Sequence, residues 1–217
     1  MSESAPARVR VWDVPTRVVH WTMVGLFAFS WWSAEEGELE WHRWSGYSLT
    51  ALVLFRLYWG FFGGSTARFS QFLRGPRAVV SYLRGNAVPT PGHNPVGAWS
   101  VVLMLALLAT QIVLGLFAVD VDGLESGPMS SLVSFETGRA AAGWHETTFN
   151  VLLAIIAVHI LAAVYYLVVR KQNLIGAMFT GKRKLDGAPA ALVPASVVRL
   201  IVGILLAMAL TWFISRE

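Results

Sequence analysis

Cysteine is absent from the 217-residue sequence, and this absence excludes several kinds of site. The chain has no disulfide bond, no thiolate-bound iron–sulfur cluster, no covalently attached c-type haem and no cysteine-ligated zinc. A transition metal or a haem iron would therefore need histidine or methionine ligands. The sequence contains five histidines and six methionines.

Charged residues are also scarce, at 14% of the chain, whereas soluble domains carry about 25%. Hydrophobic residues make up 55%, and the mean hydropathy is +0.56. Too few polar residues remain to cover the surface of a water-soluble particle, so the composition predicts an integral membrane protein. No small-residue cleavage site follows the first apolar run, and we expect no signal peptide.

Five long apolar segments predict five membrane-spanning helices. They cover residues 18–32, 44–62, 98–119, 147–169 and 193–214. Most of the ten tryptophans fall near the predicted ends, as they do in the aromatic belts of membrane interfaces. The predicted fold class is all-α, an integral membrane helical bundle.

The placement of lysine and arginine predicts the orientation of the chain. If the N-terminus is cytoplasmic, thirteen basic residues fall on the inner side, and only Arg43, Arg139 and Arg216 fall on the outer side. The net charge of +4 is thus a topology signal, and we expect no nucleic-acid partner.

Acidic residues gather on the predicted outer side, where ten of them against three arginines give a net charge of −7. Such a field could steer a basic partner, or it could serve only the solubility of the loops. The ten residues are Glu35, Glu36, Glu38, Glu40, Asp120, Asp122, Glu125, Glu136, Glu146 and Glu217.

Four of the five histidines sort by depth into two pairs. His20 and His159 lie in the inner halves of the first and fourth predicted spans, and His42 and His145 stand just before the second and fourth spans on the outer side. His145 and His159 are 14 residues apart, so one helix face would present both at depths about 21 Å apart. Neutral imidazole is a usual axial ligand of haem iron, so this pattern predicts two bis-histidine haem sites.

Other uses of these histidines are weaker. A zinc site of the His-Glu-x-x-His type is missing, because His145-Glu146 has no second histidine at that spacing. A histidine proton relay is an alternative, but the predicted spans contain no carboxylates. A single histidine in a membrane helix commonly serves only a structural hydrogen bond, which explains four depth-matched histidines poorly.

Three further features accompany the histidines. Gly25 and Gly46 follow His20 and His42 closely and would leave room for a flat macrocycle, or simply let helices approach. Arg56 within the second span needs an anion, such as a haem propionate or a carboxylate at a quinone site, unless it snorkels to the inner surface. His93 stands before the third predicted span on the inner side, and we interpret it as a structural turn or interfacial residue, with a role in a quinone pocket as the alternative.

Several segments together resemble bacterial cytochrome b561 and the related cytochrome b subunit of nickel–iron hydrogenases. The resemblance covers roughly residues 10–181. The segments that carry it are residues 12–21 (WDVPTRVVHW), 42–47 (HRWSGY), 55–60 (FRLYWG), 92–95 (GHNP), 144–150 (WHETTFN) and 159–166 (HILAAVYY).

The resemblance implies a four-helix core, residues 1–181, that holds two b haems, with His20 paired to His159 and His42 paired to His145. It also implies one-electron transfer in the respiratory chain of the bacterial inner membrane, between membrane quinone and a periplasmic redox protein such as a c-type cytochrome or a hydrogenase. The fifth helix, within residues 182–217, departs from the four-span pattern. Alternative functions are a superoxide:quinone oxidoreductase, a histidine-based proton-coupled transporter, and a haem-free anchor subunit.

Overall fold

The computed structural model describes residues 7–86, 92–122, 125–185 and 192–216, so Glu217 and the first six residues of the predicted core lie outside the described residues. Each of the five predicted apolar ranges coincides with a long helix. These helices are α1 (Val14–Glu35), α2 (Leu39–Phe62), α5 (Pro95–Phe117), α6 (Phe135–Val168) and α8 (Val197–Ile214).

Polar residues at the N-caps fix where four of these helices begin. The side chains of Asp13, Asn94, Ser134 and Ser196 each accept a hydrogen bond from a backbone N–H in the first turn. The cap at Ser134 starts α6 twelve residues before the apolar range at residue 147. At 34 residues, α6 is about 51 Å long, well beyond the roughly 30 Å of a bilayer's hydrocarbon core.

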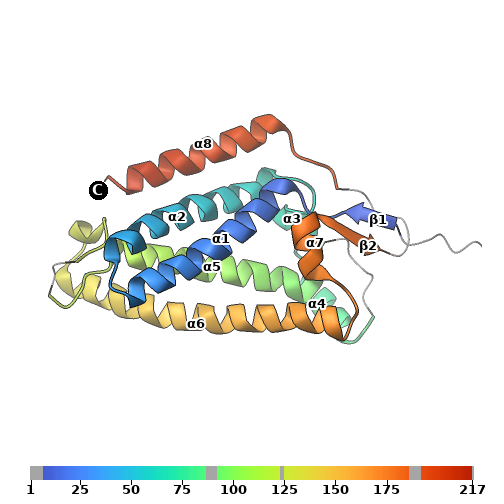
Figure 1. Cartoon of the computed structure of the whole chain (residues 1–217), viewed down its shortest axis with the longest axis horizontal. Coiled ribbons are helices and arrows are strands. Elements are labelled where there is room, and N and C mark those ends of the chain that lie inside the picture. Colours follow the sequence, from blue (N-terminus) through green and yellow to red (C-terminus); the bar gives the residue numbers. More distant parts are fainter. Residues whose placement is uncertain (1–6, 87–91, 123–124, 186–191, 217) are drawn as a thin grey trace, which may run out of the picture.

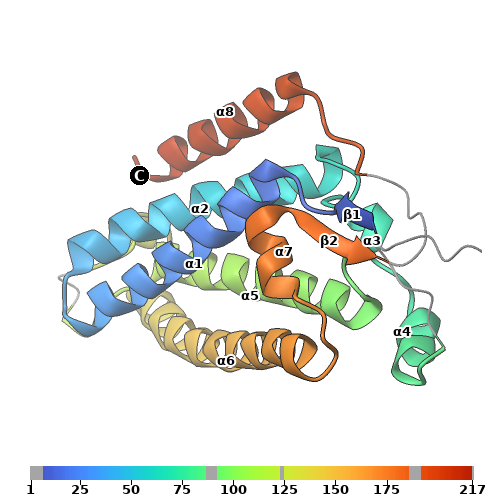
Figure 2. The same cartoon turned by 45° about the vertical axis from the view of Figure 1, so that its right-hand side comes forward.

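Two helical hairpins form the centre of the molecule. Helix α1 packs on α2, α5 packs on α6, and α2 joins the hairpins through its contacts with α5 (Figures 1 and 2). Helix α8 lies outside, against α2, where Gly203 permits close approach because a Cβ there would stand 2.5 Å from Tyr58. Whether α8 forms a unit separate from residues 1–181 stays a prediction.

Short elements gather at the two ends of the bundle. At one end, strands β1 (Ala7–Arg10) and β2 (Lys182–Leu185) pair antiparallel beside α7 (Leu174–Thr180), with α3 (Phe69–Phe72) and α4 (Pro76–Leu83) close by (Figure 2). The sequence did not predict this small sheet. At the opposite end, the α1–α2 turn lies near the segment with the 3-10 helix η1 (Ser130–Leu132) (Figure 1).

The surface of the bundle is apolar, as expected for a membrane protein. Among the described residues, α5, α6 and α8 are long and apolar enough to cross a membrane. Large side chains such as Leu161 and Leu205 are 67% and 61% exposed on these helices, which is typical of lipid-facing positions. Helices α1 and α2 have 22 and 24 residues but are more polar, so the count of five spans stays a prediction.

Candidate functional site

The four depth-matched histidines lie on three helices of the two hairpins. His20 is on α1, His42 is in the first turn of α2, and His145 and His159 are both on α6. His42 and His145 are therefore inside helices, whereas the apolar pattern placed them just before the spans. Each predicted pair takes one histidine from the α1–α2 hairpin and one from α6.

His42 and His145 lie opposite one another. Their ring centres are 6.1 Å apart, and their planes meet at 83°. The Nδ1 atom of His42 is 2.8 Å from the carbonyl oxygen of Ser30, and Nδ1 of His145 is 2.9 Å from that of Gln111. Because a carbonyl oxygen only accepts hydrogen bonds, both Nδ1 atoms donate, and both Nε2 atoms keep a lone pair for a metal.

This geometry fits one metal ion between two imidazoles. Rings that bind a metal from opposite sides, with metal–nitrogen bonds of about 2 Å, have centres about 6 Å apart. The observed separation of His42 and His145 matches that value. Donation from Nδ1 to a backbone carbonyl is also the usual orienting contact of a metal-bound histidine. The donor set therefore fits a haem iron with two axial nitrogens.

A cavity of about 420 Å³ surrounds this histidine pair, and α1, α2, α5 and α6 all contribute to its lining. Gly46 lines it, and a Cβ built there meets nothing within 4 Å. Gly115 lines it as well, but its Cβ would stand 2.9 Å from Cε1 of His145. Gly115 thus leaves room for the His145 ring, a role that the sequence did not reveal because Gly115 sits 30 residues away.

Charged residues stand around the rim of the cavity. Among the described residues that line it, Arg43 is the only arginine or lysine, and the lining also contains the carboxylates of Glu35, Asp120, Glu125 and Glu146. The Arg43 guanidinium is 3.8 Å from Glu125, and both side chains are nearly half exposed. Because four carboxylates outnumber this one cation, the charged part of the lining is acidic.

The second pair is less completely defined. His20 and His159 are both half-buried and lie within electrostatic range of one another. The His20 ring packs edge-to-face against Trp21 at 5.0 Å. In the described part of the chain, the buried Nδ1 of His20 has no hydrogen-bond partner. In this respect His20 differs from His42 and His145, whose Nδ1 atoms are bonded to backbone carbonyls.

His93 lies at the same end of the bundle as this second pair. Its ring sits between Trp12 and Phe72, with centres 4.6 and 4.7 Å away, as expected for a structural residue. Burial, followed by the charges of Arg56, His159 and His20, lowers the pKa of His93 to about 3. The side chain is therefore neutral at physiological pH, even though part of its surface is accessible.

Arg56 is buried near the same end and does not snorkel to the surface. Its guanidinium lies 3.5 Å from the carbonyl oxygen of Ala67 and over the ring of Phe69 at 5.3 Å. The buried carboxylate of Asp13 lies within electrostatic range and accepts a 2.9 Å hydrogen bond from Nε1 of Trp59. Asp13 is thus an anionic neighbour that the sequence did not reveal, because it is 43 residues away.

Comparison with known proteins gives one family. The family model described as prokaryotic cytochrome b561 matches residues 11–181, which include all five histidines and the helices α1 to α7. No curated protein and no solved structure matches the chain.

Proposed function

Because the chain belongs to the prokaryotic cytochrome b561 family, we propose that it is a dihaem b-type cytochrome of the bacterial inner membrane. The family implies a membrane protein that binds haem b and transfers electrons. Haem supplies a reversible one-electron couple at its iron. The residues of the chain hold the two groups, orient their ligands and keep water from them.

The outer site carries the proposal. His42 and His145 would hold the haem iron through their Nε2 atoms, and their carbonyl-bonded Nδ1 atoms keep both rings oriented. Their separation of 6.1 Å, in the lining of a cavity between four helices, is the single observation that supports this function best. Gly46 gives space beside the ligand, and Arg43 neutralises negative charge at the rim.

The inner site uses His20 and His159, which lie near each other on α1 and α6. Since α6 contributes a ligand to both sites, 14 residues set their separation at about 21 Å along the helix axis. Arg56 lies at this end, where its positive charge would stabilise a bound anionic group such as a haem propionate. Asp13 is the acidic residue of the chain that interacts with it there.

Electrons then pass between membrane quinone and a redox protein at the periplasmic face, with the N-terminus in the cytoplasm. The separation of charge between the ends of the molecule supports this orientation. The end with β1, β2, α4 and α7 is rich in arginine and lysine, whereas the end with the α1–α2 turn carries the acidic rim.

The visible spectrum of the purified protein and a pyridine hemochrome assay test this function. We expect two non-covalent b haems per chain, both six-coordinate and low-spin. A preparation without haem, or one with a single haem at full expression and folding, would refute the dihaem assignment.

A further inference from the structure

Helix α4 is held against the basic end of the bundle by one of its faces. The Tyr82 hydroxyl is hydrogen-bonded to that of Tyr166 at the end of α6, and Nδ2 of Asn94 donates to the same Tyr166 oxygen at 3.0 Å. Just before the helix, the Arg74 carbonyl accepts a 2.9 Å hydrogen bond from Nε1 of Trp99 on α5. These bonds fix α4 beside the ends of the two apolar helices α5 and α6.

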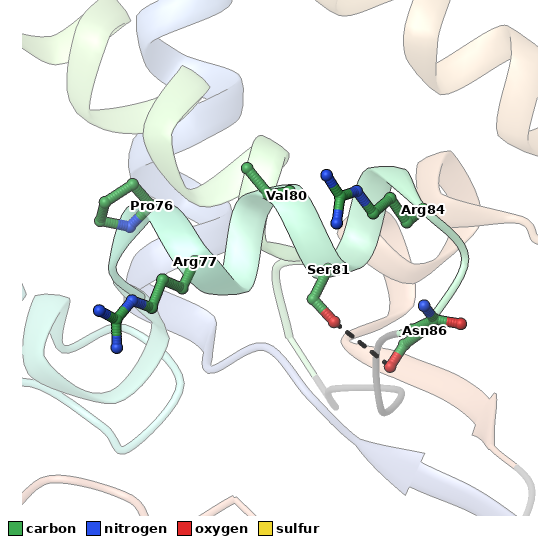
Figure 3. A pocket seen from close by; sticks show the side chains of 6 residues that line it. All are labelled: Pro76, Arg77, Val80, Ser81, Arg84 and Asn86. Carbon is green, nitrogen blue, oxygen red and sulfur yellow. Dashed lines mark hydrogen bonds between the residues drawn. The ribbon is translucent and has the colours of Figure 1, made fainter.

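The opposite face of α4 combines apolar and basic side chains. Pro76, Val80 and Leu83 are exposed on it, Val80 to 45% and Leu83 to 70%. Arg77 and Arg84 flank them; since they are seven residues apart, they lie about 20° from each other around the helix. Figure 3 shows Pro76, Arg77, Val80 and Arg84 of this face, which line a cavity of about 440 Å³; Leu83 is outside the lining.

The two arginines lack acidic partners. In the part of the chain that the structure describes, neither guanidinium is paired with a carboxylate. Residues 41–119 contain no aspartate or glutamate at all. The hydroxyl of Ser81 and the backbone of Asn86 add polar groups on the same side of the cavity, joined by a long hydrogen bond of 3.5 Å (Figure 3).

We propose that α4 is an interfacial helix that binds the headgroup of an anionic phospholipid. Arg77 and Arg84 supply the positive charge that attracts the phosphate, because guanidinium groups suit its oxygen atoms. Val80 and Leu83 enter the boundary between headgroups and acyl chains, as the apolar face of an interfacial helix does. This lipid site is independent of electron transfer and of the haem-binding cavity.

The apolar residues identify the phosphate as part of a lipid. A site for a soluble phosphate does not require an exposed leucine and valine beside its cations. The acyl chains of a lipid, in contrast, would cover both apolar side chains. Anionic lipids also attract basic residues close to the membrane surface. This attraction increases the affinity for the lipid about fivefold per arginine.

Native mass spectrometry of the purified full-length protein, titrated with dioleoyl phosphatidylglycerol, tests the proposal. We expect Arg77→Gln/Arg84→Gln to raise the dissociation constant about 25-fold, from about fivefold for each arginine. Val80→Ser/Leu83→Ser should weaken binding as well. Wild-type protein should bind dioleoyl phosphatidylcholine no better than the arginine double variant binds the anionic lipid.

The matched control is Arg8→Gln/Lys184→Gln. These exposed residues are cross-strand partners in the β1–β2 sheet, so the control removes the same charge from the same end of the molecule. It should leave the dissociation constant within about twofold. An equal loss in this control, or unchanged binding by the α4 double variant, would overturn the site. Displacement of the lipid by millimolar glycerol phosphate would instead make it a soluble-phosphate site and overturn the lipid assignment.

Discussion

The imidazoles of His42 and His145 lie opposite one another, with ring centres 6.1 Å apart, and each donates its Nδ1 proton to a backbone carbonyl of a neighbouring helix. His42 bonds to Ser30 on α1, and His145 bonds to Gln111 on α5. Helices α1, α2, α5 and α6 therefore all take part in fixing these two imidazoles. Such preorganisation favours metal binding because the protein does not need to reorder the ligands.

The histidine substitutions should fall into two classes. We expect His42→Ala and His145→Ala to remove the same haem, and His20→Ala and His159→Ala to remove the other. The reason is that an iron with one remaining protein ligand loses half of its axial coordination. Haem content and potentiometric redox titration of the four variants measure this outcome.

His93→Ala is the control for that series, because His93 packs between Trp12 and Phe72 and our proposal does not use it as a haem ligand. This variant should keep both haems and lose only packing. Loss of a haem in His93→Ala would make His93 a ligand. Matching titration curves for His20→Ala and His42→Ala would show that the pairing is wrong.

Gly115→Ala should disturb the outer haem without removing a ligand. The new Cβ would stand 2.9 Å from Cε1 and 3.2 Å from Nδ1 of His145, so the ring must move away from its hydrogen bond with Gln111. We expect lower occupancy of the outer haem or a high-spin component, seen by electron paramagnetic resonance.

Gly143→Ala is the matched control on α6, since a Cβ there meets nothing within 4 Å. It should leave the spectrum unchanged and, in the interior of a helix, stabilise the fold by roughly 0.5–1 kcal/mol. A normal low-spin outer haem in Gly115→Ala would contradict the positioning role of this glycine.

Arg43→Gln should lower the midpoint potential of the outer haem. A positive charge near the iron favours the reduced state, and Arg43 is the arginine at the rim of the cavity. Because the side chain is nearly half exposed, solvent screens it, and we expect a decrease of about 30 mV.

Glu125→Gln should shift the potential upward for the opposite reason, whereas Arg216→Gln, at the end of α8, should leave it unchanged. Equal shifts for Arg43→Gln and Arg216→Gln would indicate only a general surface-charge effect.

The sequence predicted the long helices well because apolar runs of this length have few other structures open to them in a membrane. It predicted the ends less well where polar residues continue a helix. The start of α6 at Phe135 depends on the cap at Ser134, and a hydropathy pattern does not register this cap.

The site was predictable only as far as residue type and depth determine it. The family resemblance is confirmed by the match over residues 11–181, but the ligand roles of the four histidines stay predictions. The carbonyl partners Ser30 and Gln111, and the space left by Gly115, depend on how helices pack. Backbone carbonyls occur at every position, so no sequence pattern marks the ones that orient a ligand.

Electron exchange with a basic soluble cytochrome should be faster at low salt. Glu36, Glu38 and Glu40 are exposed at the α1–α2 turn, immediately before His42, and the acidic rim of the cavity adjoins them. An opposite charge on the partner raises the encounter rate, and salt screens this attraction beyond about 10 Å at 0.1 M.

Replacing the three glutamates together with glutamine should slow the second-order rate about tenfold at low ionic strength and flatten its salt dependence. The spectra of both haems should not change, because none of the three side chains lines the cavity beside His42 and His145. Stopped-flow measurements at several salt concentrations, with a neutral small-molecule reductant as the control, separate docking from intrinsic electron transfer. A rate that ignores both ionic strength and the triple substitution would leave these glutamates with a role in solubility alone.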